Sequence, residues 1–319
     1  MRVLVVKFSS LGDVIHALPA VTDAGRMLKE TITIDWAIEE QYRLLADWHP
    51  AVERTIPIAL RRWRRMLLSD SLPALRTYLQ ELRSCTYDAV IDAQGLVKSS
   101  VFGVAAARGP GHGFSSRCAR EPVASFFYGG GRHFISTGLH MIERIRRLFA
   151  MTLGYQLPEN TPDYGLPNQR TGQTADNTVL LLHATAQQRK LLAEEKWITI
   201  GKMLLSRGLQ PELPWGSEVE RQRAERIAAA GGGRVLARLP LEEMAAKMTA
   251  ATGAIGLDTG LTHLAAALQL PCLGLYVATD PKRTGNLGSN CKQLENAGAI
   301  DAQQIVATFD SLLAKPDRQ

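Results

Sequence analysis

The 319-residue chain has few cysteines and no long apolar run. Its four cysteines are scattered, with no CxxC pair and no spacing typical of metal ligands: Cys85, Cys118, Cys272 and Cys291. A reduced, cytoplasmic protein is the simplest interpretation of this usage. No segment approaches the ~18–20 apolar residues that a membrane-spanning helix needs, and the N-terminal apolar stretch is too short for a signal-peptide core. We therefore expect a soluble protein without disulfides.

The glycine fingerprint G-x-G-x-x-G of dinucleotide-binding folds is also missing. Asp35, within the second expected strand, and Glu39, just after it, are candidates for the ribose-binding acid of such a fold, but without the glycines they indicate little. The sequence therefore argues against a nicotinamide-dependent oxidoreductase.

Positive charge, in contrast, is present in excess and is clustered. The formal net charge is +6, and four arginines surround Trp63: Arg61, Arg62, Arg64 and Arg65. Such a cluster suits anionic lipid or another polyanion, whereas no nucleic-acid-binding motif accompanies it. A second basic group, at residues 144–147, is expected to be an ordinary solvated face.

Strand and helix patterns alternate along the chain, which predicts an α/β protein with parallel sheets covered on both faces. The alternation stops at residues 155–177, which hold several prolines and few apolar side chains, and then resumes. We therefore predict two domains, at residues 1–160 and 161–319, in a chain long enough for two cores. An amphipathic helix at about residues 301–314 could pack back on the first domain.

The most informative segment is AIGLDTGLTHLAAALQLPCLGLY, residues 254–276. It predicts a buried strand ending at Asp258, a tight turn, and a helix beginning near Gly260. The start of such a helix presents unpaired backbone N–H groups to a diphosphate, and Thr259 adds a hydroxyl donor. Asp258 and His263 can hydrogen-bond sugar or ribose hydroxyls. The segment is typical of a nucleotide-sugar site, although helix capping alone would also explain it.

Polar residues follow two other predicted strands. In the first domain, Ser10, Gly12 and Asp13 come after the first strand, where ligands of open α/β sheets bind. Asp13 is either an ionisable group of the site or a helix N-cap. In the second domain, Thr185 and Lys190 can donate to and neutralise a phosphate. Glu220, after the next strand, can accept hydrogen bonds from ribose hydroxyls.

Together these segments resemble the ADP-heptose:lipopolysaccharide heptosyltransferase family over nearly the whole chain. The stretches that carry the resemblance occur in order: MRVLVVKFSSLGDVIHALPA, YDAVIDAQGLVKS, AREPVASFFY, LLHAT, LPWGSEVE, GLDTGLTHLAAAL and YVATDP. The segments IDAQGLVKS and LPWG are more similar to the members that add the first heptose than to those that add the second.

The resemblance implies a GT-B fold, in which two Rossmann-like domains face a central cleft. It implies an N-terminal domain for the acceptor and a C-terminal domain for the nucleotide sugar. The implied reaction moves L-glycero-D-manno-heptose from ADP-heptose to Kdo of Kdo2-lipid A, with inversion and without metal or another cofactor. The absence of a D-x-D motif agrees with metal independence. The implied location is the cytoplasmic surface of the inner membrane, to which the protein would attach peripherally.

The resemblance also assigns roles to residues. Asp13 matches the general base of the family. Donor-site positions fall on Thr185, Lys190, Glu220, Leu239, Asp258, Thr259, Gly260 and His263. Leu239 stands where the family has methionine, and Leu192-Ala193 replaces the usual Trp-Pro after the lysine segment.

An acceptor that carries carboxylates and phosphates needs cationic and polar ligands. We expect these ligands to be Ser10, Gly12, Arg61, Arg62, Arg64, Lys98, His112 and Arg120. Two alternatives remain open at this point. One is a related transferase, such as one acting at the second heptose position, and the other is a non-catalytic polyanion-binding protein.

Overall fold

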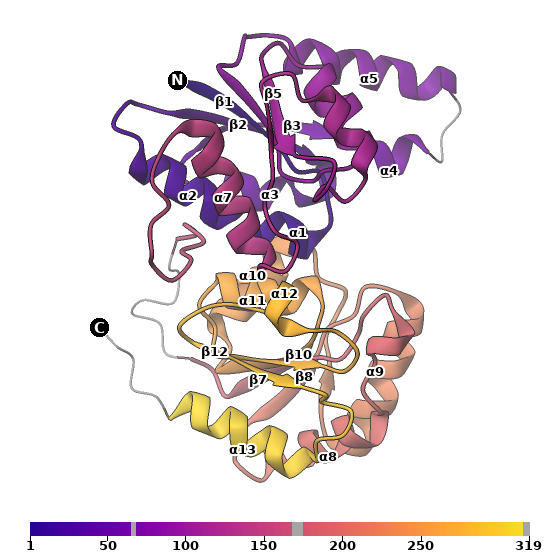
Figure 1. Cartoon of the computed structure of the whole chain (residues 1–319). Helices are drawn as coiled ribbons and strands as arrows, with labels where there is room; N and C mark the ends of the chain where they lie inside the picture. Colours follow the sequence, from indigo (N-terminus) through magenta and orange to yellow (C-terminus); the bar gives the residue numbers. More distant parts are fainter. Residues whose placement is uncertain (65–67, 168–174, 315–319) are drawn as a thin grey trace. The chain divides into compact units, whose positions relative to one another are not determined.

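The computed structural model describes residues 1–64, 68–167 and 175–314. Contacts divide the chain into two compact units, Met1–Leu166 and Pro167–Gln319 (Figure 1). The division falls after residue 160, because residues 155–166 pack on the first unit and bury Tyr164 and Leu166 there. None of the helices in the described residues has the length and hydropathy needed to cross a bilayer.

The first unit contains a six-stranded parallel sheet in the order β3-β2-β1-β4-β5-β6. Its strands are β1 (Arg2–Val6), β2 (Thr33–Glu39), β3 (Val52–Ile58), β4 (Ala89–Asp92), β5 (Gly111–Phe114) and β6 (Gly131–His133). Its helices and short turns are α1 (Leu11–Ile15), α2 (Leu18–Met27), η1 (Glu40–Tyr42), α3 (Arg43–Asp47), α4 (Leu60–Trp63), α5 (Leu68–Leu82), α6 (Val97–Ser99), η2 (Ser100–Ala105), η3 (Pro122–Phe127) and α7 (Met141–Leu153).

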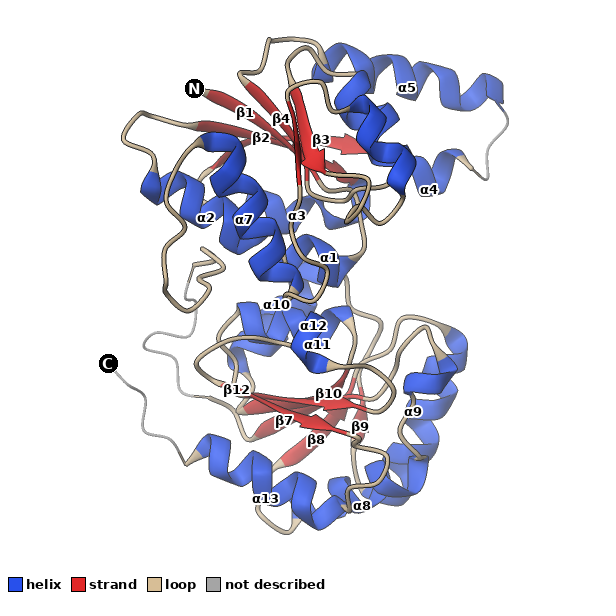
Figure 2. Cartoon of the chain, viewed as in Figure 1, coloured by secondary structure: helices blue, strands red, loops and turns tan. Residues whose placement is uncertain are grey.

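Helices cover both faces of this sheet. Figure 2 shows α2 and α7 on one face and α5 on the other. The face under α5 also carries Val104 of η2 and Tyr128, which pack in one core with Tyr78 of α5. Because β1 is buried on both sides, its sequence is continuously apolar rather than alternating, and Val3 and Val5 have no exposed surface.

The second unit repeats this architecture, with the strand order β12-β11-β10-β7-β8-β9. Its strands are β7 (Thr178–Leu182), β8 (Gln210–Leu213), β9 (Arg234–Val235), β10 (Gly253–Leu257), β11 (Cys272–Tyr276) and β12 (Cys291–Glu295). Its helices are η4 (Gln188–Lys190), α8 (Glu194–Leu205), α9 (Glu218–Gly231), α10 (Leu241–Ala250), α11 (Gly260–Ala267), α12 (Pro281–Thr284) and α13 (Ala302–Leu313).

The last helix, α13, does not follow the expectation that it packs back on the first domain. Its buried side chains, among them Phe309, belong to the core of the second unit with Trp197 of α8. The helix lies against α8, β11 and β12 of that unit. The apolar face that the sequence showed is therefore covered locally.

In each parallel sheet the order in which successive strands are added reverses between two central strands, and we call this place the reversal point. In the first unit β1 pairs with β2 on one side and with β4 on the other, so the loops after β1 and β4 diverge. In the second unit β7 pairs with β8 and β10, and the loops after β7 and β10 diverge in the same way. Ligands of open α/β sheets bind at the carboxyl ends of strands at such points.

Several local expectations were wrong. The apolar spacing of residues 14–28 predicts a single helix, but the structure has two, α1 and α2. The pattern of residues 73–83 predicts a helix that begins at Pro73, but α5 begins before this proline and contains it. The short strands β5, β6 and β12 and the edge strand β3, which contains Pro57, were not predicted. An edge strand tolerates proline, since one side of it has no ladder partner.

Two arginines of the second basic group are buried rather than solvated, whereas Arg147 is exposed and pairs with Glu143. Arg146 is 3% exposed and its guanidinium donates to both carboxylate oxygens of Asp23. Arg144 lies with its guanidinium carbon 4.8 Å from the ring centroid of Phe114 and donates to the carbonyl of Cys118. Helical spacing cannot reveal such partners, since they come from distant elements.

Candidate functional site

In the first unit the loops after β1 and β4 are joined by buried contacts. Lys7 Nζ donates to the carbonyl of Ala93 at 2.9 Å, and the Phe8 N–H donates to Gln94 Oε1 at 2.8 Å. Lys98 Nζ lies 3.4 Å from Ser9 Oγ. The reversal point of this sheet therefore holds two lysines together with the serine-rich loop.

Asp13 is the carboxylate of this loop cluster and keeps partial exposure, at 26% of its side chain. Its Oδ2 accepts hydrogen bonds from the Ser10 N–H and Ser10 Oγ, both at 3.1 Å. Lys7 Nζ lies 4.0 Å from its Oδ1, and an Arg120 nitrogen lies 3.9 Å from its Oδ2. Burial alone would raise the pKa of Asp13, but the Lys7 charge, the Ser10 hydrogen bonds and Arg120 outweigh it and lower that pKa. Asp13 is thus an ionised carboxylate that solvent can reach and that can accept a proton.

A second carboxylate, Asp92, ends β4 and has no exposed surface. It accepts hydrogen bonds from the Gln94 and Gly95 N–H groups and from three hydroxyls, those of Ser99, Ser100 and Tyr128. Burial raises the pKa of Asp92 despite these hydrogen bonds. Its contacts hold the loop that carries Lys98, which makes Asp92 structural here.

Several expected acceptor ligands gather near Lys98. The pKa of Lys98 is lowered by burial and then by the positive charges of Arg64, Arg61 and Arg120, with the Glu39 carboxylate acting in the opposite direction, so each of these arginines lies within electrostatic range of Lys98. The Arg61 guanidinium carbon lies 5.6 Å from the Tyr42 ring centroid. These four residues, Arg61, Arg64, Lys98 and Arg120, form what we call the basic cluster. Arg65 lies outside the described residues.

Two expected acceptor ligands are engaged elsewhere. Arg62 forms a two-point ion pair with Glu40, both side chains being largely exposed. His112 stacks on His133, with ring centroids 6.0 Å apart, and burial and the His133 charge lower its pKa. Gly12 is buried in the first turn of α1, where it is followed directly by Asp13.

In the second unit the reversal point brings Lys190 and Asp258 together. Lys190 Nζ donates to Asp258 Oδ2 at 2.7 Å, although the two residues follow different strands, β7 and β10. Thr279 Oγ1 donates to the same oxygen at 2.8 Å, and His263 Nε2 lies 3.6 Å from Oδ1. Burial opposes ionisation of Asp258, but His263, Lys190 and Thr279 lower its pKa far below the ordinary value. The expected lysine does reach the Asp-Thr-Gly turn.

The same turn opens α11. Thr259 is the N-cap residue in an extended conformation, and its carbonyl accepts from Thr262 and His263. Thr262 Oγ1 also donates to the carbonyl of Leu257 at 2.6 Å, which fixes the turn to the end of β10. The N–H groups of the first helical residues, beginning with Gly260, have no partner within a helix and point outward from its start. The arrangement places a positive dipole end beside Lys190.

The remaining donor candidates lie after β7, β8 and β9. Glu220 Oε2 accepts from the Gly216 and Ser217 N–H groups at 2.7 and 3.1 Å, which makes it the third-position partner of the capping box of α9. Trp215 Nε1 donates to the carbonyl of Leu236 and so ties this loop to the segment that carries Leu239. Thr185 is half-buried in the loop after β7.

Sequence reasoning missed Lys7, Asp92 and Thr279. Lys7 had one signal, a charge directly after the apolar run VLVV, and Thr279 had another, a hydroxyl just past β11. Asp92 closes an apolar strand in the same way. All three are polar residues at or just beyond the carboxyl end of a strand.

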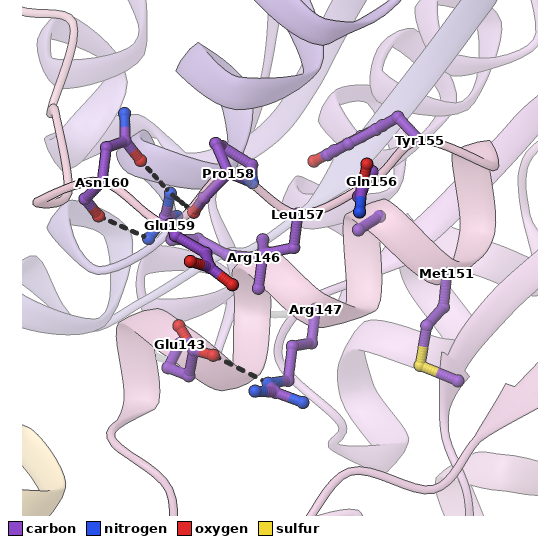
Figure 3. A pocket seen from close by; sticks show the side chains of 11 residues that line it. Glu143, Arg146, Arg147, Met151, Tyr155, Gln156, Leu157, Pro158, Glu159 and Asn160 are labelled. Atoms are coloured by element: carbon purple, nitrogen blue, oxygen red, sulfur yellow. Dashed lines mark hydrogen bonds and ion pairs between the residues drawn. The ribbon is translucent and has the colours of Figure 1, made fainter.

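Two features of the described residues point away from other sites. No group of three or more His, Cys, Asp or Glu side chains is placed there to hold a metal ion. A cavity of about 500 Å³ lies between α7 and residues 155–160 (Figure 3). The Arg146 guanidinium at this cavity is bonded to Asp23 and to Asn160, so it holds the fold together.

Known proteins resemble this chain over nearly its whole length, including the residues around Asp13 and those around Asp258. Residues 75–309 match the model of glycosyltransferase family 9 (heptosyltransferase). The chain is 40% identical to lipopolysaccharide heptosyltransferase 1 of Escherichia coli (strain K12) over 321 aligned positions, covering 98% of this chain and all of that protein. The structure of E. coli heptosyltransferase WaaC with ADP has a TM-score of 0.90 and 39% identity, covering 98% of this chain and 100% of that one. WaaC with ADP-2-deoxy-2-fluoro heptose gives a TM-score of 0.86 and 38% identity, covering 98% and 99%.

Proposed function

Because this chain belongs to glycosyltransferase family 9, the heptosyltransferases, and has their GT-B fold of two Rossmann-like domains, we propose that it transfers heptose from ADP-heptose in lipopolysaccharide inner-core synthesis. The proposed acceptor is Kdo of Kdo2-lipid A, and the proposed outcome is inversion at the anomeric carbon. The near full-length identity to lipopolysaccharide heptosyltransferase 1 carries this proposal.

The second unit supplies the donor side. The similar enzyme has been seen with ADP and with a fluorinated ADP-heptose. In this chain the diphosphate would meet Lys190 and the N–H groups at the start of α11, with Thr259 as a further donor. These donors stabilise the charge that develops on ADP as the glycosidic bond breaks. Such a set supplies the positive charge that a metal ion gives other transferases.

The first unit supplies the base. An inverting displacement is a single step, so one carboxylate is enough to take the proton of the attacking hydroxyl. Asp13 fits this role because it is ionised, reachable from solvent and fixed by Ser10. The proton moves to an Asp13 oxygen while the acceptor oxygen bonds to the anomeric carbon and ADP departs.

The acceptor side falls to the basic cluster. Its arginines and lysine would bind the carboxylates and phosphates of an acidic saccharide through charge-assisted hydrogen bonds. A lipid-linked acceptor also requires the enzyme to work at a membrane surface. We therefore infer a cytoplasmic protein that attaches peripherally to the inner face of the inner membrane.

An acceptor comparison tests the reaction. The purified protein is incubated with ADP-heptose and Kdo2-lipid A, and ADP release is followed with and without EDTA. We expect release with this acceptor and no change with EDTA. Release only with an acceptor that already carries one heptose would instead identify a transferase for the second position, and loss of activity with EDTA would contradict metal independence.

A further inference from the structure

The first unit exposes an apolar surface beside the basic cluster. Five large side chains of α6, η2 and η3 are unusually exposed, and we call them the apolar surface: Val97, Val101, Val123, Phe126 and Phe127. Phe126 is 74% exposed and Val123 is 54% exposed. The short helices that carry them lie side by side. Exposed apolar side chains gathered in this way mark an interaction site.

The apolar surface is built on a fixed base. Ala124 and Ser125 face inward from η3 and are almost wholly buried, while Val104 anchors η2 in the same core. Ser100, at the start of η2, donates to the buried carboxylate of Asp92. Gly103 packs so closely on Val6 that a side chain there would clash. The exposed side chains are thus presented by elements that are already held in place.

The apolar surface is continuous with the basic cluster along the chain. Val97 directly precedes Lys98, and the loop that ends in Arg120 leads through Glu121 into η3. Glu121 Oε2 accepts from the Val97 N–H at 2.7 Å, which joins the two segments. The exposed Arg117 lies in the same loop as Arg120. Aromatic and aliphatic side chains next to cations match the chemistry of an anionic lipid surface.

We infer that this apolar surface docks the first unit on a bilayer that contains anionic lipid. The inference rests on the proposed lipid-linked acceptor: its acyl chains stay in the membrane while its acidic sugars reach the basic cluster. Phe126 and Val123 enter the boundary between headgroups and acyl chains, and the exposed Arg117 meets the lipid phosphates. The surface thus differs from the arginines around Trp63, which the sequence alone suggested for lipid.

Binding to vesicles without acceptor tests the inference. The variant V123S/F126S is compared with wild type by sedimentation with vesicles of phosphatidylethanolamine and phosphatidylglycerol. Loss of two exposed apolar side chains that would be buried in the bilayer on docking should lower the partition coefficient about tenfold or more. The matched control is Met151→Ser on α7, which is 53% exposed on the opposite face of the sheet and should bind as wild type does.

Further outcomes separate this surface from the proposed reaction. The double variant should keep wild-type transfer to an acceptor saccharide stripped of its acyl chains, which also shows that it is folded. If wild type transfers heptose neither to that saccharide nor to Kdo2-lipid A, the proposed function fails, whatever the vesicles show. Equal vesicle binding by wild type and double variant overturns the docking surface. It is also overturned if wild type binds vesicles of pure phosphatidylcholine as well as it binds vesicles that contain phosphatidylglycerol. So does a change in oligomeric state of the double variant, which would mean that the surface joins copies of this chain.

Discussion

The ammonium of Lys7 lies 4.0 Å from Oδ1 of Asp13, although Lys7 itself is only 2% exposed. A buried cation beside a partly exposed carboxylate favours the ionised form of that carboxylate. Burial lowers the pKa of Lys7, and the charge of Asp13 counters this effect. The pair therefore sets the protonation state of the proposed base.

Removing the Lys7 charge should shift the pH profile. In Lys7→Met the pKa of Asp13 rises, because its largest favourable interaction is gone while burial remains. A base with a raised pKa becomes protonated at higher pH, so the acidic limb of kcat/KM should move upward. Arg120→Gln, which removes a more exposed charge 3.9 Å away, should move the limb less. An unchanged acidic limb in Lys7→Met would show that Lys7 does not act on the base.

Asp13→Asn should impair the chemical step. Loss of a general base typically costs about 10²–10⁴-fold in rate, and we expect kcat to fall in that range. Binding of ADP, measured by calorimetry, should be unchanged, because the proposed diphosphate ligands belong to the other unit. A variant that keeps a wild-type kcat would remove Asp13 from the mechanism.

Lys190→Met should weaken binding of ADP. A charge-assisted hydrogen bond contributes ~1.5–3 kcal/mol, so Kd should rise about 10- to 100-fold. The Asp258 carboxylate, which keeps Thr279 and His263 but loses the Lys190 charge, would add repulsion toward the diphosphate. Arg189→Gln is the matched control, since Arg189 is exposed and its Nε donates to Gln187. Equal losses in both variants would mean that Lys190 contributes only general positive charge.

Glu220 has a structural contact that must be separated from its proposed ribose contact. Glu220→Ala should lower the free energy of unfolding by ~0.5–2 kcal/mol through loss of the capping box and should raise KM for ADP-heptose. Ser217→Ala breaks the same capping box without touching the carboxylate. It should reduce stability by a similar amount and leave KM unchanged. If Ser217→Ala raises KM as much, Glu220 acts only through the helix.

His49 should make the first unit sensitive to acid. Burial lowers the pKa of His49 to about 4, from 6.5. The neutral ring fits its partners: Nδ1 accepts from the Ala51 N–H, and Nε2 lies 2.9 Å from Thr22 Oγ1. As pH falls from 6.5 to 4, the unfolded chain binds a proton that the folded chain does not, so stability decreases by about 1.4 kcal/mol per pH unit at most.

Denaturant unfolding at both ends of this pH range measures the effect. His49→Gln cannot titrate and offers similar hydrogen bonds, so its stability should fall less over the same range. His183, whose pKa burial also lowers to about 4, remains in both proteins and accounts for the decrease that they share. Parallel slopes for wild type and His49→Gln would assign the acid sensitivity to other groups.

Much of the architecture could be predicted because it depends on local periodicity. The apolar runs before Lys7, Asp92, His183 and Asp258 identified the four central strands, and the turn residues located the site at their ends. The short or edge strands β3, β5, β6 and β12 have weak patterns, and they form only because an existing strand offers hydrogen-bond partners. The destination of α13 was equally undetermined, since an apolar stripe does not specify which core it joins.

The sequence by itself determined the family, the alternation of strands and helices, and the polar residues that follow the central strands, because all of these are carried by residue order. Only the tertiary structure decided which charges meet. Lys190 reaches Asp258 and Lys7 reaches Asp13, whereas Arg146 forms a buried ion pair with Asp23. The reason is physical: electrostatic and hydrogen-bond energies depend on distance and burial, and both are fixed by elements far apart in the chain.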